Sequence, residues 1–176
     1  MNKNTAIYAV ILSFGLALVL AVPAKKPVRE DKQMQLIELR ESIKNDADWL
    51  KIPDSTWKKV LSPEAYKILR GHGTEMACSG KLYTNKQSGT YACGACGLEL
   101  FHAEKKFDSG TGWPSFVAPI EGNIISREDS SYGMIRTEVL CRRCHSHLGH
   151  VFPDGPPPTG LRYCINSVAI EFRPSL

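Results

Sequence analysis

Four of the six cysteines in this chain form two Cys-x-x-Cys pairs, Cys93 with Cys96 and Cys141 with Cys144. Zn²⁺ binds four thiolates tetrahedrally, and a Cys-x-x-Cys turn presents two sulfurs to one ion. The pairs therefore predict one zinc site, which would be structural because four thiolates leave no open coordination position. Residues 97–140 separate the pairs, so the two turns would enclose a subdomain. Two alternatives stay open at this point, disulfide bonds and a thioredoxin-type dithiol.

The two remaining cysteines, Cys78 and Cys164, lie outside these pairs. An unpaired cysteine is more often an inert small hydrophobic residue than a nucleophile. Arg162, two residues before Cys164, would lie on the same face of a strand and favour the reactive thiolate. This neighbour makes Cys164 the stronger candidate nucleophile.

Histidines cluster in the segment that follows the second pair, at His145, His147 and His150. A cysteine with histidines nearby is the recurring arrangement of thiol catalysis. His72 and His102 have no such neighbours in the sequence, and we expect them to be ordinary surface or structural residues. Trp113, in a glycine-flanked loop, is either a core residue or the wall of an apolar pocket.

The elements that must position these residues are two helices followed by a mainly β domain. Apolar residues at helical spacing predict a helix over 32–44, and Ser62 as N-cap with Pro63 in the first turn predicts another that stops at Gly71. Short strands are expected over 89–93, 132–140 and 163–172. The last strand would place Cys164 and Asn166 on one face.

The N-terminal residues 1–24 are expected to be a signal peptide or a membrane anchor. Residues 6–22 form an uncharged apolar run preceded by Lys3, and small residues precede a potential cleavage site after Ala24. The domain would then be exported: periplasmic, secreted or anchored facing outward. Residues 25–60 are expected to form a linker and an amphipathic helix, and residues 61–174 the functional domain.

Length and composition fit one globular domain and exclude several classes of protein. The chain has 176 residues, of which 43% are hydrophobic and 23% charged, so it is neither disordered nor collagen-like. The net charge is +4, and basic and aromatic residues do not alternate along any segment, so a nucleic-acid partner is not expected.

Five ordered motifs over roughly 110 residues resemble the B-type methionine sulfoxide reductases, which reduce the R epimer of methionine sulfoxide. Besides the two cysteine pairs they are Gly73-Thr74-Glu75, Asp108-Ser109-Gly110 with Gly112-Trp113-Pro114-Ser115-Phe116, His147-Leu148-Gly149-His150-Val151-Phe152-Pro153-Asp154-Gly155-Pro156, and Arg162-Tyr163-Cys164-Ile165-Asn166-Ser167. Membership would make the chain a peptide-methionine (R)-S-oxide reductase. It implies a fold of two small antiparallel sheets in a distorted barrel, with one structural Zn²⁺.

The resemblance assigns a role to each matching residue. Cys164 matches the nucleophile, which would become a sulfenic acid. The residues expected to assist it are Arg162 at the thiolate, Asn166 on the same face, and His147, His150 and Asp154 as the polar wall that orients the sulfoxide oxygen and supplies protons. Trp113 and Phe152 would bind the substrate, and Cys93, Cys96, Cys141 and Cys144 match the zinc ligands.

The chain departs from many family members at Thr111, where they carry a resolving cysteine. Some members place that cysteine in the N-terminal loop, so the resemblance implies that Cys78 forms a disulfide with Cys164. If Cys78 cannot reach Cys164, a small thiol or the reductant itself must attack the sulfenic acid.

The partners that the resemblance implies are oxidised proteins and a thioredoxin-like reductant. The chain is expected to be a monomer, and to be attached to a membrane only if residues 1–24 are not cleaved. Two further classes remain alternatives, a zinc-stabilised binding module without the chemistry and a secreted disulfide scaffold.

Overall fold

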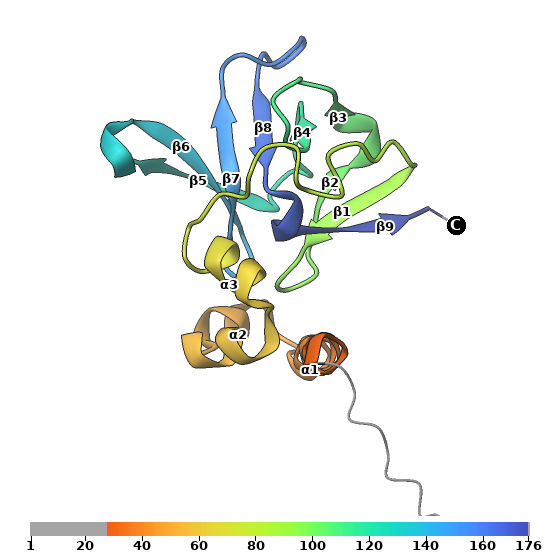
Figure 1. Ribbon diagram of the computed structural model, residues 1–176, viewed down its shortest axis with the longest axis vertical. Helices are drawn as coiled ribbons and strands as arrows, with labels where there is room; N and C mark the ends of the chain where they lie inside the picture. The colour runs from red at the N-terminus through yellow and green to blue at the C-terminus, as the bar shows by residue number, and fades with distance from the viewer. Residues whose placement is uncertain (1–27, 176) are drawn as a thin grey trace, which may run out of the picture.

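The computed structural model describes residues 28–175, which form helices at one end of a β domain (Figure 1). The helices are α1 (Val28–Ser42), a 3-10 helix (Asp46–Lys51), α2 (Asp54–Val60) and α3 (Pro63–Leu69). Ser62 caps α3 by accepting a hydrogen bond from the Ala65 amide, as its sequence predicts. No helix in this described range is long and apolar enough to cross a membrane. The predicted signal peptide or anchor, residues 1–24, lies outside the described residues.

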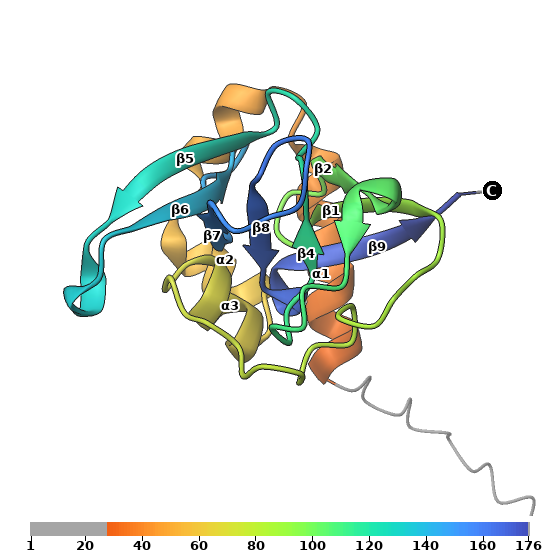
Figure 2. The same ribbon diagram turned by 90° about the horizontal axis from the view of Figure 1, so that it is seen from above.

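Two antiparallel sheets form the β domain, which confirms the predicted fold class. One sheet has the order β2-β1-β9 and the other β3-β4-β8-β7-β6-β5. The bounds of these strands are β1 (Gly89–Cys93), β2 (Glu99–His102), β3 (Lys106–Phe107), β4 (Ser115–Phe116), β5 (Ile124–Asp129), β6 (Arg136–Cys141), β7 (His147–Phe152), β8 (Arg162–Ile165) and β9 (Ile170–Pro174). The β5–β6 hairpin projects away from the rest of the molecule (Figure 2).

Aromatic packing joins the two sheets. Phe116 of the larger sheet stacks on Phe101 with ring centroids 4.3 Å apart and meets the edge of Tyr91 at 5.1 Å. All three side chains are fully buried. This core fixes the position of β4, and therefore of β8 beside it.

The expected single strand over 163–172 is wrong, because the chain turns between β8 and β9 and changes sheet. The buried carboxylate of Glu75 accepts hydrogen bonds from the amides of Ser167 and Val168, at 2.6 and 3.0 Å, and stabilises a 3-10 turn there. Similarly, the strand expected over 132–140 begins only at Arg136. The Asp129 carboxylate accepts a hydrogen bond from the Ser131 amide at 3.0 Å and shapes the hairpin turn before it.

The N-terminal segment packs more closely than a linker would. α1 starts at Val28 and ends at Ser42, so it includes residues expected to belong to the linker. Trp49 and Trp57 are buried in the core, with ring centroids 6.1 Å apart. α1 has no fully buried residue, and Ile37 remains 45% exposed.

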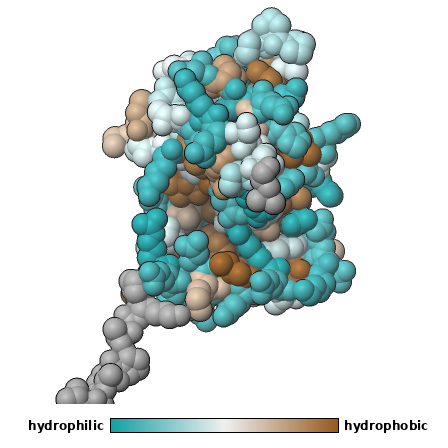
Figure 3. All heavy atoms as spheres, turned by 90° about the vertical axis from the view of Figure 1, so that its right-hand side faces the viewer, coloured by the Kyte–Doolittle hydropathy of each residue, from teal (hydrophilic) through white to brown (hydrophobic). Residues whose placement is uncertain are grey.

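Figure 3, which views the molecule from the side of β9, shows a mostly polar face with apolar side chains in separate groups.

Candidate metal centre and candidate active site

The four paired cysteines lie together in the core and fit a tetrahedral metal ion. Their sulfurs all lie within 4.8 Å of one another. The Cys93 and Cys144 sulfurs are 3.8 Å apart and those of Cys96 and Cys141 are 3.5 Å apart. Four thiolates about 2.3 Å from one Zn²⁺ have sulfurs about 3.8 Å apart, whereas a disulfide needs about 2.05 Å. All four thiols are free and buried, so the cluster is consistent with a zinc site and not with disulfides.

Two similar turns build this cluster. The Gly97 amide donates to the Cys93 carbonyl at 2.8 Å, and the His145 amide donates to the Cys141 carbonyl at 2.9 Å. Both donors have positive φ, 73° at Gly97 and 53° at His145, because the chain must reverse immediately after each second cysteine. His145 therefore belongs to the second turn and is not among the residues that line the cleft at Cys164.

Arg40 of α1 attaches the N-terminal helix to the first turn. Its guanidinium donates to the carbonyls of Cys93, Gly94 and Ala95 at 2.9–3.3 Å. It also pairs with Glu171 of β9 at 3.0 Å. A residue outside the predicted functional domain thus supports the cysteine cluster.

Cys164 lies in a separate cleft of about 140 Å³ between the larger sheet and the loop that carries Trp113. The cleft is lined by Thr74, Trp113, Arg136, Gly149, His150, Phe152, Cys164 and Asn166. On β8, Cys164 is directly opposite Ser115 of β4 and His150 of β7. The structure therefore brings together five of the expected site residues, namely Cys164, Trp113, Phe152, His150 and Asn166.

Burial raises the pKa of the Cys164 thiol, and this effect exceeds the opposing influence of its neighbours. The positive charge of Arg162 and a hydrogen bond with Thr111 both lower that pKa. Arg162 thus favours the thiolate, as expected, but does not make it the resting form.

Arg162 is itself held by Asp154 and Phe152. Its Nε and Nη2 donate to the two carboxylate oxygens of Asp154 at 2.9 and 2.8 Å, and it lies 4.6 Å from the centre of the Phe152 ring. Arg162 lowers the pKa of Asp154. Asp154 is 59% exposed and does not line the cleft, so its contact with the site runs through Arg162.

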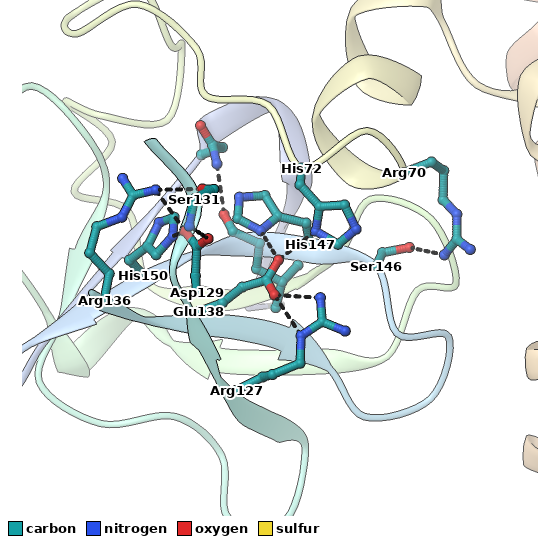
Figure 4. A network of polar contacts seen from close by, with 12 residues as sticks. Arg70, His72, Arg127, Asp129, Ser131, Arg136, Glu138, Ser146, His147 and His150 are labelled. Carbon is teal, nitrogen blue, oxygen red and sulfur yellow. Dashed lines mark hydrogen bonds and ion pairs between the residues drawn. The ribbon is translucent and has the colours of Figure 1, made fainter. Parts of the chain in front are cut away.

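His147 lines a different hollow from the one that contains Cys164. This hollow, of about 530 Å³, is bounded by His72, Arg127, Asp129, Glu138, His147 and their neighbours. The Nδ1 atoms of His147 and His72 each donate to Oε1 of Glu138 at 2.6 Å (Figure 4). His72 is exposed, as expected of a surface residue, but it shares the Glu138 carboxylate with His147. The approach of His147 to Glu138 depends on the pairing of β6 with β7, and that of His72 on the packing of the loop after α3, neither of which follows from the spacing of residues in the sequence.

His150 does line the cleft and is held by the β5–β6 hairpin. Its Nε2 donates to Oδ2 of Asp129 at 2.8 Å, and Arg136 donates to the same oxygen at 2.6 Å. Asp129, Arg136 and Glu138 were not predicted from the sequence. The only available signal was the alternation that puts Arg136 and Glu138 on one face of a strand.

Asn166 and Trp113 are fixed by the loop that precedes Cys78. The Asn166 side chain accepts from the Glu75 amide at 3.0 Å and donates to the Leu148 carbonyl at 3.0 Å. The Trp113 indole donates to the Glu75 carbonyl at 3.2 Å. The segment 73–75 thus joins two walls of the cleft.

Cys78 is exposed and lies against the loop of Trp113. Its amide donates to the Gly112 carbonyl at 2.8 Å, and its sulfur would be 2.9 Å from a Cβ atom on Gly112. Thr111, the preceding residue, is one of the groups that lower the pKa of the Cys164 thiol. Cys78 therefore contacts the residue next to one that acts on Cys164.

Comparison with known proteins places this fold and site among the SelR domains, whose family model matches residues 61–174. Three relatives named peptide methionine sulfoxide reductase MsrB are 57% to 60% identical. The proteins of Leptospira interrogans (57%, 121 residues) and Thiobacillus denitrificans (57%, 122 residues) align with 68% and 69% of this chain and 92% of their own. That of Pseudomonas putida strain F1 (60%, 119 residues) aligns with 67% of this chain and 91% of its own. The chain belongs to the B-type methionine sulfoxide reductase family.

Proposed function

We propose that this protein reduces methionine R-sulfoxide, mainly in oxidised proteins, to methionine. The observation that carries the proposal is the position of Cys164 in a small cleft whose other walls are Trp113, Phe152, His150 and Asn166. A volume of about 140 Å³ suits a side chain rather than a large ligand. The aromatic rings offer a surface for the S-methyl group, and the imidazole and amide offer polar contacts for the sulfoxide oxygen.

In the proposed reaction, the Cys164 thiolate attacks the sulfoxide sulfur. The sulfoxide oxygen takes up the proton that left the thiol and is transferred to the cysteine sulfur. Two electrons pass from the cysteine to the substrate sulfur, so the products are methionine and a sulfenic acid at Cys164. Because burial raises the pKa of this thiol, removal of its proton is part of the reaction.

Cys78 is the proposed resolving residue. Its thiol would attack the Cys164 sulfenic acid, form a disulfide and release water; a thioredoxin-like dithiol would then reduce the disulfide. Support comes from the contact of Cys78 with Gly112, which follows Thr111, a residue that lowers the pKa of the Cys164 thiol. A disulfide requires its two Cα atoms to lie within about 7 Å of each other. The exposed loop that carries Cys78 would have to bring its Cα atom that close to the Cα atom of Cys164.

The proposed metal is one structural Zn²⁺ held by Cys93, Cys96, Cys141 and Cys144. Such an ion ties the end of β1 to the end of β6 and takes no part in the reaction. The sulfur distances and complete burial of the cluster support this assignment.

We also propose that the domain acts outside the cytoplasm, as a monomer. The support for export is the uncharged apolar run over residues 6–22. The electron donor would then be an extracytoplasmic thiol protein. A fusion of residues 1–27 to a reporter enzyme that is active only after export tests this proposal, and an inactive reporter would contradict it.

An epimer-resolved assay tests the activity. The purified protein receives a peptide with racemic methionine sulfoxide and dithiothreitol, beside Cys164→Ser and Cys78→Ser. We expect only the R epimer to disappear, and not with Cys164→Ser. Cys78→Ser should remain active with dithiothreitol but fail with a thioredoxin-like donor. If the zinc-loaded protein consumed neither epimer, the reductase proposal would be wrong and a binding module would remain.

A further inference from the structure

Two carboxylates of the β5–β6 hairpin hold the two histidines expected from the sequence to move protons (Figure 4). Asp129 holds His150, and Arg136 donates to the same Asp129 oxygen. Glu138 holds His147 and accepts two hydrogen bonds from Arg127, at 2.7 and 3.0 Å. Each unit is an arginine, a carboxylate and an imidazole in contact, but only His150 lines the cleft of Cys164.

Asp129 is ionised throughout the neutral range. Hydrogen bonds from the hydroxyl and amide of Ser131 lower its pKa most, and those from His150 and Arg136 add to this. An ionised carboxylate can only accept hydrogen bonds. The His150 nitrogen in contact with it, Nε2, must therefore carry a proton.

A fixed proton on Nε2 determines what the other nitrogen of His150 can do. In the neutral ring, Nδ1 has a free lone pair and can accept a proton; in the charged ring, Nδ1 can donate one. Since Asp129 occupies Nε2, Nδ1 is the nitrogen left to exchange a proton with Cys164 or the sulfoxide oxygen.

We infer that Asp129 is a positioning residue for the proposed reduction: it fixes the Nε2–H tautomer of His150, so that Nδ1 accepts the Cys164 proton and returns it to the sulfoxide oxygen. This inference rests on the proposed function. The proton starts on the thiol and ends on the oxygen that becomes the sulfenic acid, so the step needs no further acid or base. Asp129 contacts neither the substrate nor the nucleophile and acts only through His150.

Glu138 holds its own histidine in the opposite tautomer. Its contact is with Nδ1 of His147, and burial lowers the pKa of His147 so that the ring is neutral. Nε2 of His147 is buried and has no protein hydrogen-bond partner among residues 28–175. Because His147 is outside the cleft of Cys164, we expect loss of Glu138 to affect turnover less than loss of Asp129.

Asp129→Asn tests the inference with two measurements. We expect kcat for the R-sulfoxide to fall about 10- to 100-fold with KM within about twofold, because positioning and not binding is lost. In long-range ¹H–¹⁵N spectra, His150 should show the Nε2–H pattern in the wild type and a tautomer mixture in Asp129→Asn. Glu128→Gln, which removes a neighbouring exposed carboxylate of β5, is the matched control and should match the wild type in both measurements.

Several outcomes would overturn the inference. They are wild-type turnover in Asp129→Asn, lost turnover with the His150 tautomer unchanged, and a wild-type His150 that carries its proton on Nδ1. The last measurement needs no variant, so it stands even if Asp129→Asn does not fold. A wild type that reduces no R-sulfoxide would instead contradict the proposed function, while the spectra would still show whether Asp129 fixes the tautomer.

Discussion

The four-cysteine cluster and the cleft of Cys164 use the same functional group in opposite settings. The cluster sulfurs come from two short turns, and none of the four cysteines is more than 3% exposed. Cys164 is half-buried, and its neighbours come from β4, β7, the Trp113 loop and the segment that contains Thr74. The first setting holds four thiols together, whereas the second surrounds one thiol with groups that can exchange protons.

This difference separates stability from reactivity. Metal binding at a closed thiolate site contributes directly to folding free energy, since the unfolded chain lacks the site. In the cleft, burial keeps the thiol protonated at rest, and Arg162 reduces the cost of forming the thiolate. Substitutions in the two regions should therefore change different measurements.

The largest effect is expected from Cys141→Ser. Loss of one thiolate would weaken the metal site, so we expect Tm to fall by more than about 10 °C, together with activity and bound zinc. Scanning calorimetry measures Tm, metal analysis measures the bound zinc, and the reductase assay measures the activity. Cys164→Ser is the matched control, with one sulfur removed from the cleft, and should keep its zinc and its Tm within a few degrees. A stable, active, zinc-free Cys141→Ser protein would contradict the assignment.

A smaller effect is expected from Arg162→Met, measured in the Cys78→Ser background. Because Arg162 lowers the pKa of the Cys164 thiol, its removal should raise that pKa further and slow alkylation at pH 7 by about 3- to 10-fold. Alkylation followed against pH should show a midpoint above the usual range of a thiol in both proteins, and a higher one in Arg162→Met. An unchanged midpoint would mean that Arg162 does not influence the thiol.

The smallest effect is expected from Arg40→Met, which removes the contacts of α1 with the first cysteine turn. We expect a loss of about 1–2 kcal/mol in the free energy of unfolding and of about 3–6 °C in Tm, with kcat unchanged. Arg29→Met, at an exposed position of the same helix, should change neither. A loss of kcat in Arg40→Met without a change in Tm would contradict the separation of the two regions.

The same contrast explains what the sequence could predict. The four-cysteine cluster is built from two turns of local spacing, so the two cysteine pairs identified all four of its residues. The break after β8 depends on Glu75, which is distant in sequence and binds the amides of Ser167 and Val168. Likewise, the contact of His147 with Glu138 depends on the pairing of β6 with β7, which includes a register shift between Val139 and Leu140, and the contact of His72 depends on how the loop after α3 packs on that sheet. Sequence periodicity does not contain that shift.

The most direct test of this division follows oxidation of the five cysteines that remain in the Cys78→Ser protein during a single turnover. The Cys78→Ser protein, loaded with zinc and free of reductant, receives one equivalent of the R-sulfoxide peptide and then a reagent that traps sulfenic acids. Peptide mass mapping should find the trapped adduct at Cys164 alone, with one equivalent of methionine formed and the zinc retained. Oxidation at the paired cysteines with release of zinc, and an unmodified Cys164, would contradict the division of roles between the two regions.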